Sequence, residues 1–257
     1  MNKLTFWIYG AALLLVSGLA SAQSVYYSDN TSHSGEIATA AAELAASLGG
    51  AAVPFDGSSD GEWGTALASA SVIFQGQSGQ VAGLSPAVRS DIADFVSGGG
   101  ALLLLRSSEN IALMNEILGT TMTDGTSTSG SGTPPIPRTS AGDSSNFASA
   151  PASLPTLNDH LTIDTASIPP SVLSAYELSG ETHVASASFG SGSVTYLSWD
   201  WCCGDTPAQR ADWDMALLAA SGFTAIAVPV TNPVVLGMLS FMLALFGIQY
   251  LRRRTGG

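Results

Sequence analysis

The stretch from Leu84 to Arg106, LSPAVRSDIADFVSGGGALLLLR, constrains the fold more than any other part of the chain. Ser85 is a suitable helix N-cap, and Pro86 fits the first helical turn, where a missing N–H has no cost. The apolar residues that follow recur at helical spacing: Val88, Ile92, Phe95 and Val96. Gly98–Gly100 end this helix, and the unbroken apolar run Ala101–Leu105 is typical of a strand covered on both faces. Helix, glycine turn and buried strand together predict half of an α/β domain.

The rest of the first half of the chain repeats this alternation. Strand patterns cover Ser24–Ser28, Ala51–Phe55 and Ser71–Gln75, helical patterns lie between them, and a further helix is expected over Glu109–Leu118. This rhythm predicts a doubly wound, mostly parallel α/β sheet with helices on both faces. Near the end, two alternating strands joined by glycines predict a C-terminal β-hairpin, followed by a helix: Val184–Phe189, Ser193–Ser198 and Pro207–Ala220.

The segment 119–156 interrupts this pattern. It is dominated by Ser, Thr, Gly, Pro and Ala, and it contains Pro134-Pro135 and Pro137. We expect a long, low-complexity loop on the surface here, inside one domain that spans residues 23–228.

The first 22 residues have the pattern of a secretory signal peptide. Lys3 gives a positive start, Ala11–Val16 is a short apolar run, and Ala20-Ser21-Ala22 is a small-residue cleavage site. The mature chain is expected to begin at Gln23. Export would place the domain beyond the inner membrane.

The C-terminal segment 229–257 predicts one transmembrane helix. Val234–Leu251 carries no charge and is long enough to cross a bilayer, and Arg252–Arg254 follow directly. By the positive-inside rule these arginines stay in the cytoplasm, so the domain would be a single-pass protein of the cell envelope or cell surface.

The domain itself is strongly acidic. Residues 23–228 hold all 20 acidic residues of the chain but only four of its eight basic ones, a formal charge of −16. Such a surface repels nucleic acid, so we expect no nucleic-acid partner. The only cysteines, Cys202 and Cys203, are neighbours, and they form either a strained vicinal disulfide or two free thiols.

Two of these features resemble one known superfamily. LSPAVRSDIADFVSGGGALLLL is similar to the helix–glycine–strand unit of class I glutamine amidotransferase-like (flavodoxin-like) domains, and FGSGSVTYLSWDW resembles their closing hairpin. An active member would carry a cysteine after a central strand and a late His-x-Glu pair. Here the matching turn holds Gly76-Gln77-Ser78-Gly79, and no His-x-Glu occurs. The resemblance therefore implies the fold without the amidotransferase chemistry.

The tail resembles C-terminal sorting domains of the PEP-CTERM and IPTL-CTERM kind. PVTNPVVLGMLSFMLALFGIQYLRRR has their proline-containing start, single helix and arginine cluster, although Val228-Pro229 with Pro233 matches neither motif. The resemblance implies cleavage by an exosortase-like processing enzyme and a setting rich in extracellular polysaccharide. The alternative is a permanent anchor.

Ligands of open α/β sheets bind beyond the carboxyl ends of the parallel strands. The ligand-binding candidates at those ends are Gln75, Gln77, Arg106, Glu109 and Asp200. A hydrolase would use Ser78 as nucleophile, His33 as base and Asp29 to orient it. Carboxylates Asp29, Asp56 and Asp200 are hard ligands suited to calcium, but no calcium-loop motif is present, and we expect no metal and no cofactor.

The sequence thus predicts an exported, envelope-anchored or sortase-processed α/β domain with a binding or structural role. The alternative is an extracytoplasmic hydrolase whose pocket lies at the carboxyl ends of the strands.

Overall fold

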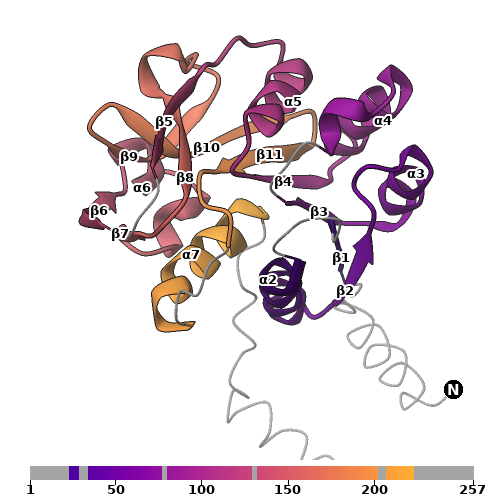
Figure 1. Cartoon of the computed structure of the whole chain (residues 1–257), viewed down its shortest axis with the longest axis horizontal. Coiled ribbons are helices and arrows are strands. Elements are labelled where there is room, and N and C mark those ends of the chain that lie inside the picture. Colours follow the sequence, from indigo (N-terminus) through magenta and orange to yellow (C-terminus); the bar gives the residue numbers. More distant parts are fainter. Residues whose placement is uncertain (1–22, 29–33, 77–79, 129–131, 202–206, 223–257) are drawn as a thin grey trace, which may run out of the picture. The chain divides into compact units, whose positions relative to one another are not determined.

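A nine-stranded sheet organises the molecule in this computed structural model, which describes residues 23–28, 34–76, 80–128, 132–201 and 207–222 (Figure 1). Eight strands lie side by side in the order β2 (Ala51–Phe55), β1 (Ser24–Ser28), β3 (Val72–Gln75), β4 (Ala101–Leu105), β11 (Gly192–Leu197), β10 (Glu181–Phe189), β8 (His160–Asp164) and β5 (Asp124–Thr128). β9 (Leu173–Leu178) also pairs with β10.

The sheet has a parallel half and an antiparallel half. Each pairing from β2 to β11 is parallel, whereas β10 pairs antiparallel with β11, β9 and β8, and β5 pairs antiparallel with β8. The predicted mixed α/β architecture with a mostly parallel central sheet is confirmed, as is the hairpin of β10 and β11.

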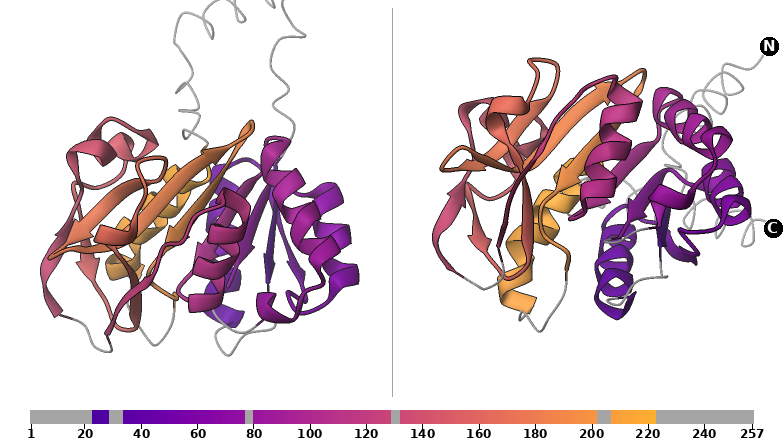
Figure 2. Two further views of the ribbon diagram at one scale, coloured as in Figure 1. Left: turned by 90° about the horizontal axis from the view of Figure 1, so that it is seen from above. Right: turned by 45° about the horizontal axis from the view of Figure 1, so that its top comes forward.

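Helices cover both faces of the parallel half, as the two views of Figure 2 show. Side chains of α2 (Ser34–Ser47) and α7 (Pro207–Ala220) enter one apolar core. Those of α3 (Asp60–Ser69), α4 (Pro86–Ser97) and α5 (Ser108–Leu118) enter the other.

The apolar run that dominates the sequence forms β4, at the centre of the sheet. All five of its residues are buried, with at most 3% of any residue exposed. Leu103 and Leu105 point into the core under α2 and α7, while Leu102 and Leu104 point into the other. Alternation of this kind explains why no polar residue interrupts the run, because neither face meets water.

The helix before β4 begins and ends as predicted. Ser85 is its N-cap and accepts a hydrogen bond from the backbone N–H of Val88. The glycine turn after it packs against the hairpin turn of β10 and β11: a Cβ at Gly192 would lie 2.2 Å from the carbonyl oxygens of Gly100 and Val96. The glycine turn Gly98–Gly100 and the glycine turn of the β10–β11 hairpin therefore contact each other directly in the fold.

The prediction of a loop over 119–156 needs correction. This segment contains β5, a second small sheet of β6 (Gly132–Pro137) and β7 (Ser153–Thr156), the helix α6 (Ser140–Asp143) and the 3-10 turn η2 (Asn146–Ser149). Its large apolar residues are buried: Ile136, Phe147 and Leu154 in the core that includes α7, and Met122 in the other core. Because these residues are widely spaced in a Ser- and Gly-rich sequence, they form neither the period of 2 that predicts a strand nor the period of 3.6 that predicts a helix.

Two short 3-10 turns, η1 (Val81–Gly83) and η3 (Thr165–Ser167), complete the described elements. Across the part of the chain with described placement, no helix combines the length and the apolar character that crossing a membrane requires. The signal segment 1–22, the predicted span Val234–Leu251 and Arg252–Arg254 lie outside the described residues.

Candidate functional site

The carboxyl ends of the parallel strands meet at one edge of the sheet. β1 ends at Ser28, β3 at Gln75, β4 at Leu105 and β11 at Leu197. The strand order reverses between β1 and β3, since the chain passes from β1 outward to β2 and then returns to the other side of β1. Such a reversal is where open α/β sheets form ligand crevices.

Buried amide side chains gather at this reversal. Gln75 and Asn110 are fully buried and Gln80 is 6% exposed. Nε2 of Gln75 donates to Oε1 of Gln80 at 3.2 Å. Nδ2 of Asn110 donates to the carbonyl oxygens of Leu105 at 2.6 Å and of Gly76 at 3.1 Å.

These amides are only partly satisfied. Among the described residues, Oε1 of Gln75, Nε2 of Gln80 and Oδ1 of Asn110 are buried and have no hydrogen-bond partner. A buried polar atom without a partner costs about 1–3 kcal/mol. The two oxygens are hydrogen-bond acceptors and Nε2 of Gln80 is a donor, so together they could bind a small polar group that both donates and accepts hydrogen bonds.

A glycine keeps space beside these amides. A Cβ at Gly57 would lie 2.4 Å from Oε1 of Gln80, 2.9 Å from Cβ of Ser28 and 3.1 Å from Oε1 of Gln75. Any larger residue at position 57 would press on the cluster, so the close packing at the reversal depends on this glycine.

Arg106 stands at the carboxyl end of β4, between two carboxylates. Its Nη2 lies 3.3 Å from Oδ1 of Asp159, and its Nη1 lies 3.9 Å from Oδ2 of the fully buried Asp200. The Arg106 side chain is 18% exposed. Its charge is therefore balanced within the protein, which disfavours an additional anion and leaves a hydrogen-bonding wall.

A pocket of about 500 Å³ opens beside this arginine. It lies at the N-terminus of α5, where Oγ of Ser108 donates to the carboxylate of Asp124. Its wall is formed by Arg106, Ser107, Ser108, Asp124, Gly125, Ser127 and Leu161. We call it the edge pocket.

Two histidines meet one serine just beyond β11. Oγ of Ser198 lies 2.9 Å from Nδ1 of His160 and 3.0 Å from Nδ1 of His183. Nε2 of His160 accepts the backbone N–H of Leu157 at 3.1 Å, so its proton is on Nδ1 and is donated to Ser198. The hydroxyl of Ser198 can then donate to Nδ1 of His183.

Both imidazoles are held neutral. Burial lowers the pKa of His160 to about 3, with smaller contributions from His183 and Arg106, and burial lowers the pKa of His183 to about 4. Ser198 and His160 are fully buried beside Trp213, whose ring centroid lies 5.4 Å from that of His160. The group is therefore interior, and a substrate has no direct access to this serine.

The structure places four of the predicted ligand-binding candidates at the carboxyl edge: Gln75, Arg106, Glu109 and Asp200. Gln77, the hydrolase residues Ser78, His33 and Asp29, and the pair Cys202 and Cys203 lie outside the described residues. Asp56 accepts hydrogen bonds from its neighbour Ser58. Within the described ranges, no group of three or more His, Cys, Asp and Glu side chains is placed to hold a metal ion.

Sequence reasoning missed most of the buried polar groups. Asn110 had a detectable signal, because it lies in the first turns of the helix that follows the central strand. His160, His183 and Gln80 had none, since their partners are fixed only by the fold. Four tryptophans are fully buried, so none of them offers a ring to a ligand at the surface: Trp63, Trp199, Trp201 and Trp213.

No protein-family model matches this chain, and no curated protein matches it. Solved structures do resemble it. The cytoplasmic proteins STM3548 and STM1381 of Salmonella typhimurium align with TM-scores of 0.52 and 0.53 at 10% and 12% identity, covering 78% and 77% of this chain and 98% and 99% of theirs. A glutamine amidotransferase of Thermotoga maritima aligns with a TM-score of 0.50 at 14% identity, covering 85% of this chain and 95% of its own. The chain therefore has a glutamine amidotransferase-like fold.

Proposed function

We propose that this protein is an exported, non-catalytic binding domain of the cell envelope or extracellular matrix, and that it binds a neutral polar ligand in the edge pocket. The main observation behind this proposal is that the positive charge of Arg106 is already paired with carboxylates of the protein. Among the described residues of this pocket wall, Arg106 is the one cation, and it is already flanked by Asp159 and Asp200. The pocket is therefore suited to hydrogen bonding with a neutral ligand rather than to holding an anion.

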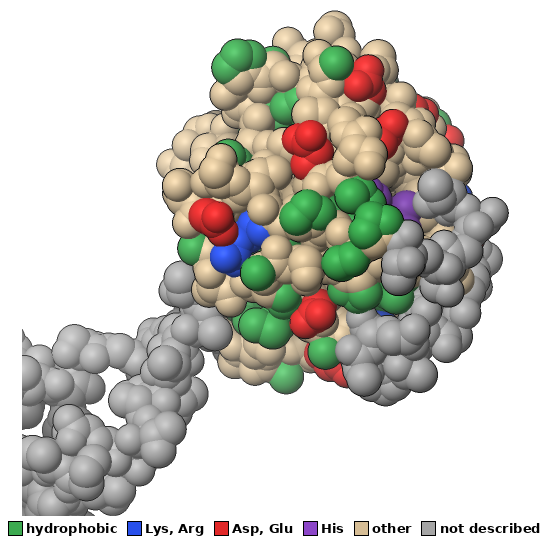
Figure 3. All heavy atoms as spheres, turned by 90° about the vertical axis from the view of Figure 1, so that its left-hand side faces the viewer, with side chains coloured by type: hydrophobic (Ala, Val, Ile, Leu, Met, Phe, Trp, Pro, Cys, Tyr) green, Lys and Arg blue, Asp and Glu red, His purple; other side chains and the backbone are tan. Residues whose placement is uncertain are grey.

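Extracellular polysaccharide is the partner class that we propose. The acidic charge of the domain argues against acidic polymers and nucleic acid. On the face shown in Figure 3, acidic side chains are spread over the surface, whereas basic ones show at few places. A neutral, hydroxyl-rich polymer avoids this repulsion and offers donors and acceptors together.

The two chain ends support the location in this proposal. The segment 1–22 reads as a signal peptide, and 229–257 reads as a sorting tail or anchor with Arg252–Arg254 on the cytoplasmic side. We propose that a membrane-embedded, exosortase-like enzyme processes this tail.

The edge pocket is tested by filling it. Ser127 is exposed on its wall, so Ser127→Tyr places a ring in the pocket, and Thr121→Tyr adds the same ring at an exposed position outside it. We expect the full-length protein to be retained by a neutral polysaccharide column, Ser127→Tyr to elute earlier, and Thr121→Tyr to behave as wild type. Equal retention of all three would contradict an edge-pocket role.

The hydrolase alternative predicts a different result. If Ser78 acts as a nucleophile with His33, the wild-type protein hydrolyses small esters or amides and Ser78→Ala does not. We expect no difference between the two proteins in such assays. A turnover that Ser78→Ala abolishes would replace the binding proposal with the hydrolase.

A further inference from the structure

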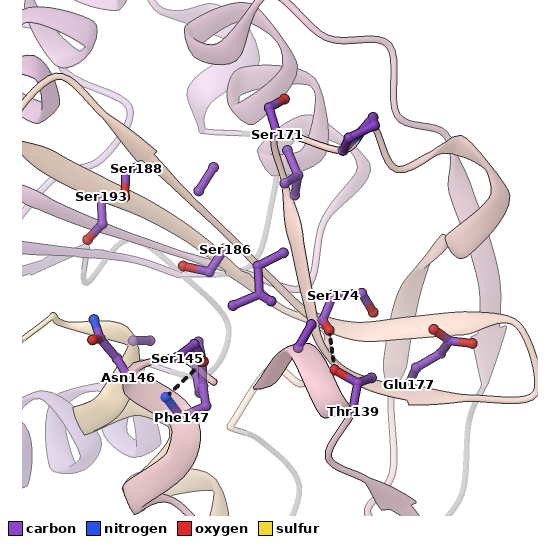
Figure 4. Close-up of a pocket in the computed structure, with 16 residues that line it drawn as sticks. Thr139, Ser145, Asn146, Phe147, Ser171, Ser174, Glu177, Ser186, Ser188 and Ser193 are labelled. Atoms are coloured by element: carbon purple, nitrogen blue, oxygen red, sulfur yellow. Dashed lines mark hydrogen bonds between the residues drawn. The ribbon is translucent and has the colours of Figure 1, made fainter. Parts of the chain in front are cut away.

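A second cavity, of about 640 Å³, lies on the antiparallel half of the sheet. It is bounded by β9, β10 and β11 on one side and by α6, η2 and the turn Pro170–Val172 on the other, and it shares no lining residue with the edge pocket (Figure 4). Its volume lies within the range of about 300–1,000 Å³ that ligand pockets occupy.

Hydroxyl side chains are the most frequent kind in the lining. Seven of its sixteen residues are Ser or Thr. Ser186 and Ser188 are two residues apart on β10 and so share one face of the sheet, and Ser193 of β11 lies directly opposite Ser188. The strands therefore present a patch of hydroxyls where apolar side chains would otherwise face a covering helix.

Some of these hydroxyls are held by the protein and others face the cavity. Oγ of Ser186 is 2.8 Å from Oγ1 of Thr195, and Oγ of Ser174 is 2.8 Å from Oγ1 of Thr182. Ser188 is exposed and Ser193 is half-buried, at the end of the cavity toward which Asn146 of η2 projects (Figure 4). A ligand hydroxyl there meets groups that both donate and accept.

The charge of the lining selects among ligands. Among the described residues that line the cavity, Glu177 is the only ionisable one and none is basic. An anionic ligand would meet this carboxylate without a compensating cation. Apolar patches from Leu173 and Pro170 suit the C–H faces of a sugar ring.

We propose that this cavity binds one unit of a neutral saccharide, through hydrogen bonds to Ser188, Ser193 and Asn146. The ligand class rests on the proposed binding function, whereas the location is independent of the edge pocket. Among the described residues that line the cavity, the one aromatic side chain is Phe147, which is 2% exposed and offers little ring surface to a sugar. We therefore expect weak affinity for a short saccharide, with a dissociation constant on the order of 1 mM.

The test uses the full-length protein and isothermal titration with neutral trisaccharides (β-1,4-glucan, α-1,4-glucan and β-1,4-mannan) and with a trisaccharide of uronic acids. The variant pair is Ser188→Val/Ser193→Val against Ser188→Thr/Ser193→Thr. Val and Thr have nearly the same shape and both suit strands, so the pair differs in the hydroxyls alone. We expect at least one neutral trisaccharide to bind, the Val pair to weaken it about tenfold, and the Thr pair to keep it.

The possible results of these titrations separate the cavity inference from the proposed function. If a neutral trisaccharide binds but the Val pair binds it as tightly as wild type, the cavity inference is wrong while the proposed function stands. Tighter binding of the uronic trisaccharide than of the neutral ones overturns the charge argument. If wild type binds no neutral saccharide and also fails on the polysaccharide column, the proposed function fails with it.

Discussion

At the scale of single residues, the buried pair His160 and His183 gives the molecule a defined response to pH. Both pKa values are lowered in the folded protein, to about 3 and about 4, from 6.5. As pH falls below 6.5, these two imidazoles become protonated in the unfolded chain but stay neutral in the folded protein. The stability from the neutral imidazoles is therefore complete above pH 6.5 and declines as the pH falls toward the folded pKa values.

We predict that the free energy of unfolding falls by about 2 kcal/mol for each of these histidines between pH 7 and pH 5. Urea denaturation at both pH values measures the change, and His183→Gln should remove about half of it. An unfolding free energy that is flat from pH 7 to pH 5 would show that these imidazoles are not held neutral.

At the scale of elements, the two glycine turns that touch are a sensitive point. A Cβ at Gly192 would come within 2.2 Å of the carbonyl oxygens of Gly100 and Val96, which are backbone and cannot easily yield. We predict that Gly192→Ala lowers the unfolding free energy by about 2 kcal/mol or more. The matched control is Gly64→Ala on the exposed side of α3, where nothing lies within 4 Å of the new Cβ.

Gly64→Ala should be neutral or stabilising by about 0.5–1 kcal/mol, because alanine is the better helix former. Thermal unfolding of both variants checks the contrast. The contact between the turns would be refuted by a Gly192→Ala protein as stable as wild type.

A second element depends on one arginine. Nε of Arg138 lies 2.6 Å from Oδ1 of Asp143, and its Nη1 donates to the carbonyl oxygens of Phe147, Ala148 and Ala150. These bonds hold α6 and η2 together as one wall of the hydroxyl-lined cavity. We predict that Arg138→Met costs about 2–4 kcal/mol and weakens saccharide binding, whereas Arg138→Lys has a smaller effect.

Chemical denaturation measures the first effect and calorimetric titration the second. If Arg138→Met left both unchanged, this wall would be held by its apolar residues alone.

The elements also show what sequence can and cannot predict. Ala101–Leu105 and the helix before it were predictable because the helical spacing of apolar residues, the capping residues and the unbroken apolar run all indicate the same local structure. The cavity wall around Arg138 could not be predicted from the sequence. The four hydrogen-bond acceptors of Arg138 lie up to twelve residues away in a Ser- and Gly-rich segment, and no sequence pattern marks them as its partners. The ends of β3 and β4 were predictable from their apolar runs, and Gln75 and Arg106 lie at these strand ends in the structure. Asp159 and Asp200, as partners of Arg106, came only with the structure.

At the scale of the whole molecule, the proposal separates a folded domain from two terminal segments that direct its location. We predict that the protein recovered from cells begins at Gln23 and is absent from the cytosol. Intact-mass spectrometry of envelope and medium fractions gives both ends of the mature chain. A cytosolic protein that still begins at Met1 would contradict export, and a mass that retains Arg252–Arg254 would identify the tail as a permanent anchor.

The central claim is that this fold binds a neutral glycan without altering it. The most direct measurement incubates the full-length protein with a neutral polysaccharide, separates bound from free protein, and determines the mass and acyl content of the recovered polymer. We predict retained protein and an unchanged polymer. A polymer that is shortened or deacylated, or a protein that is not retained at all, would contradict the account.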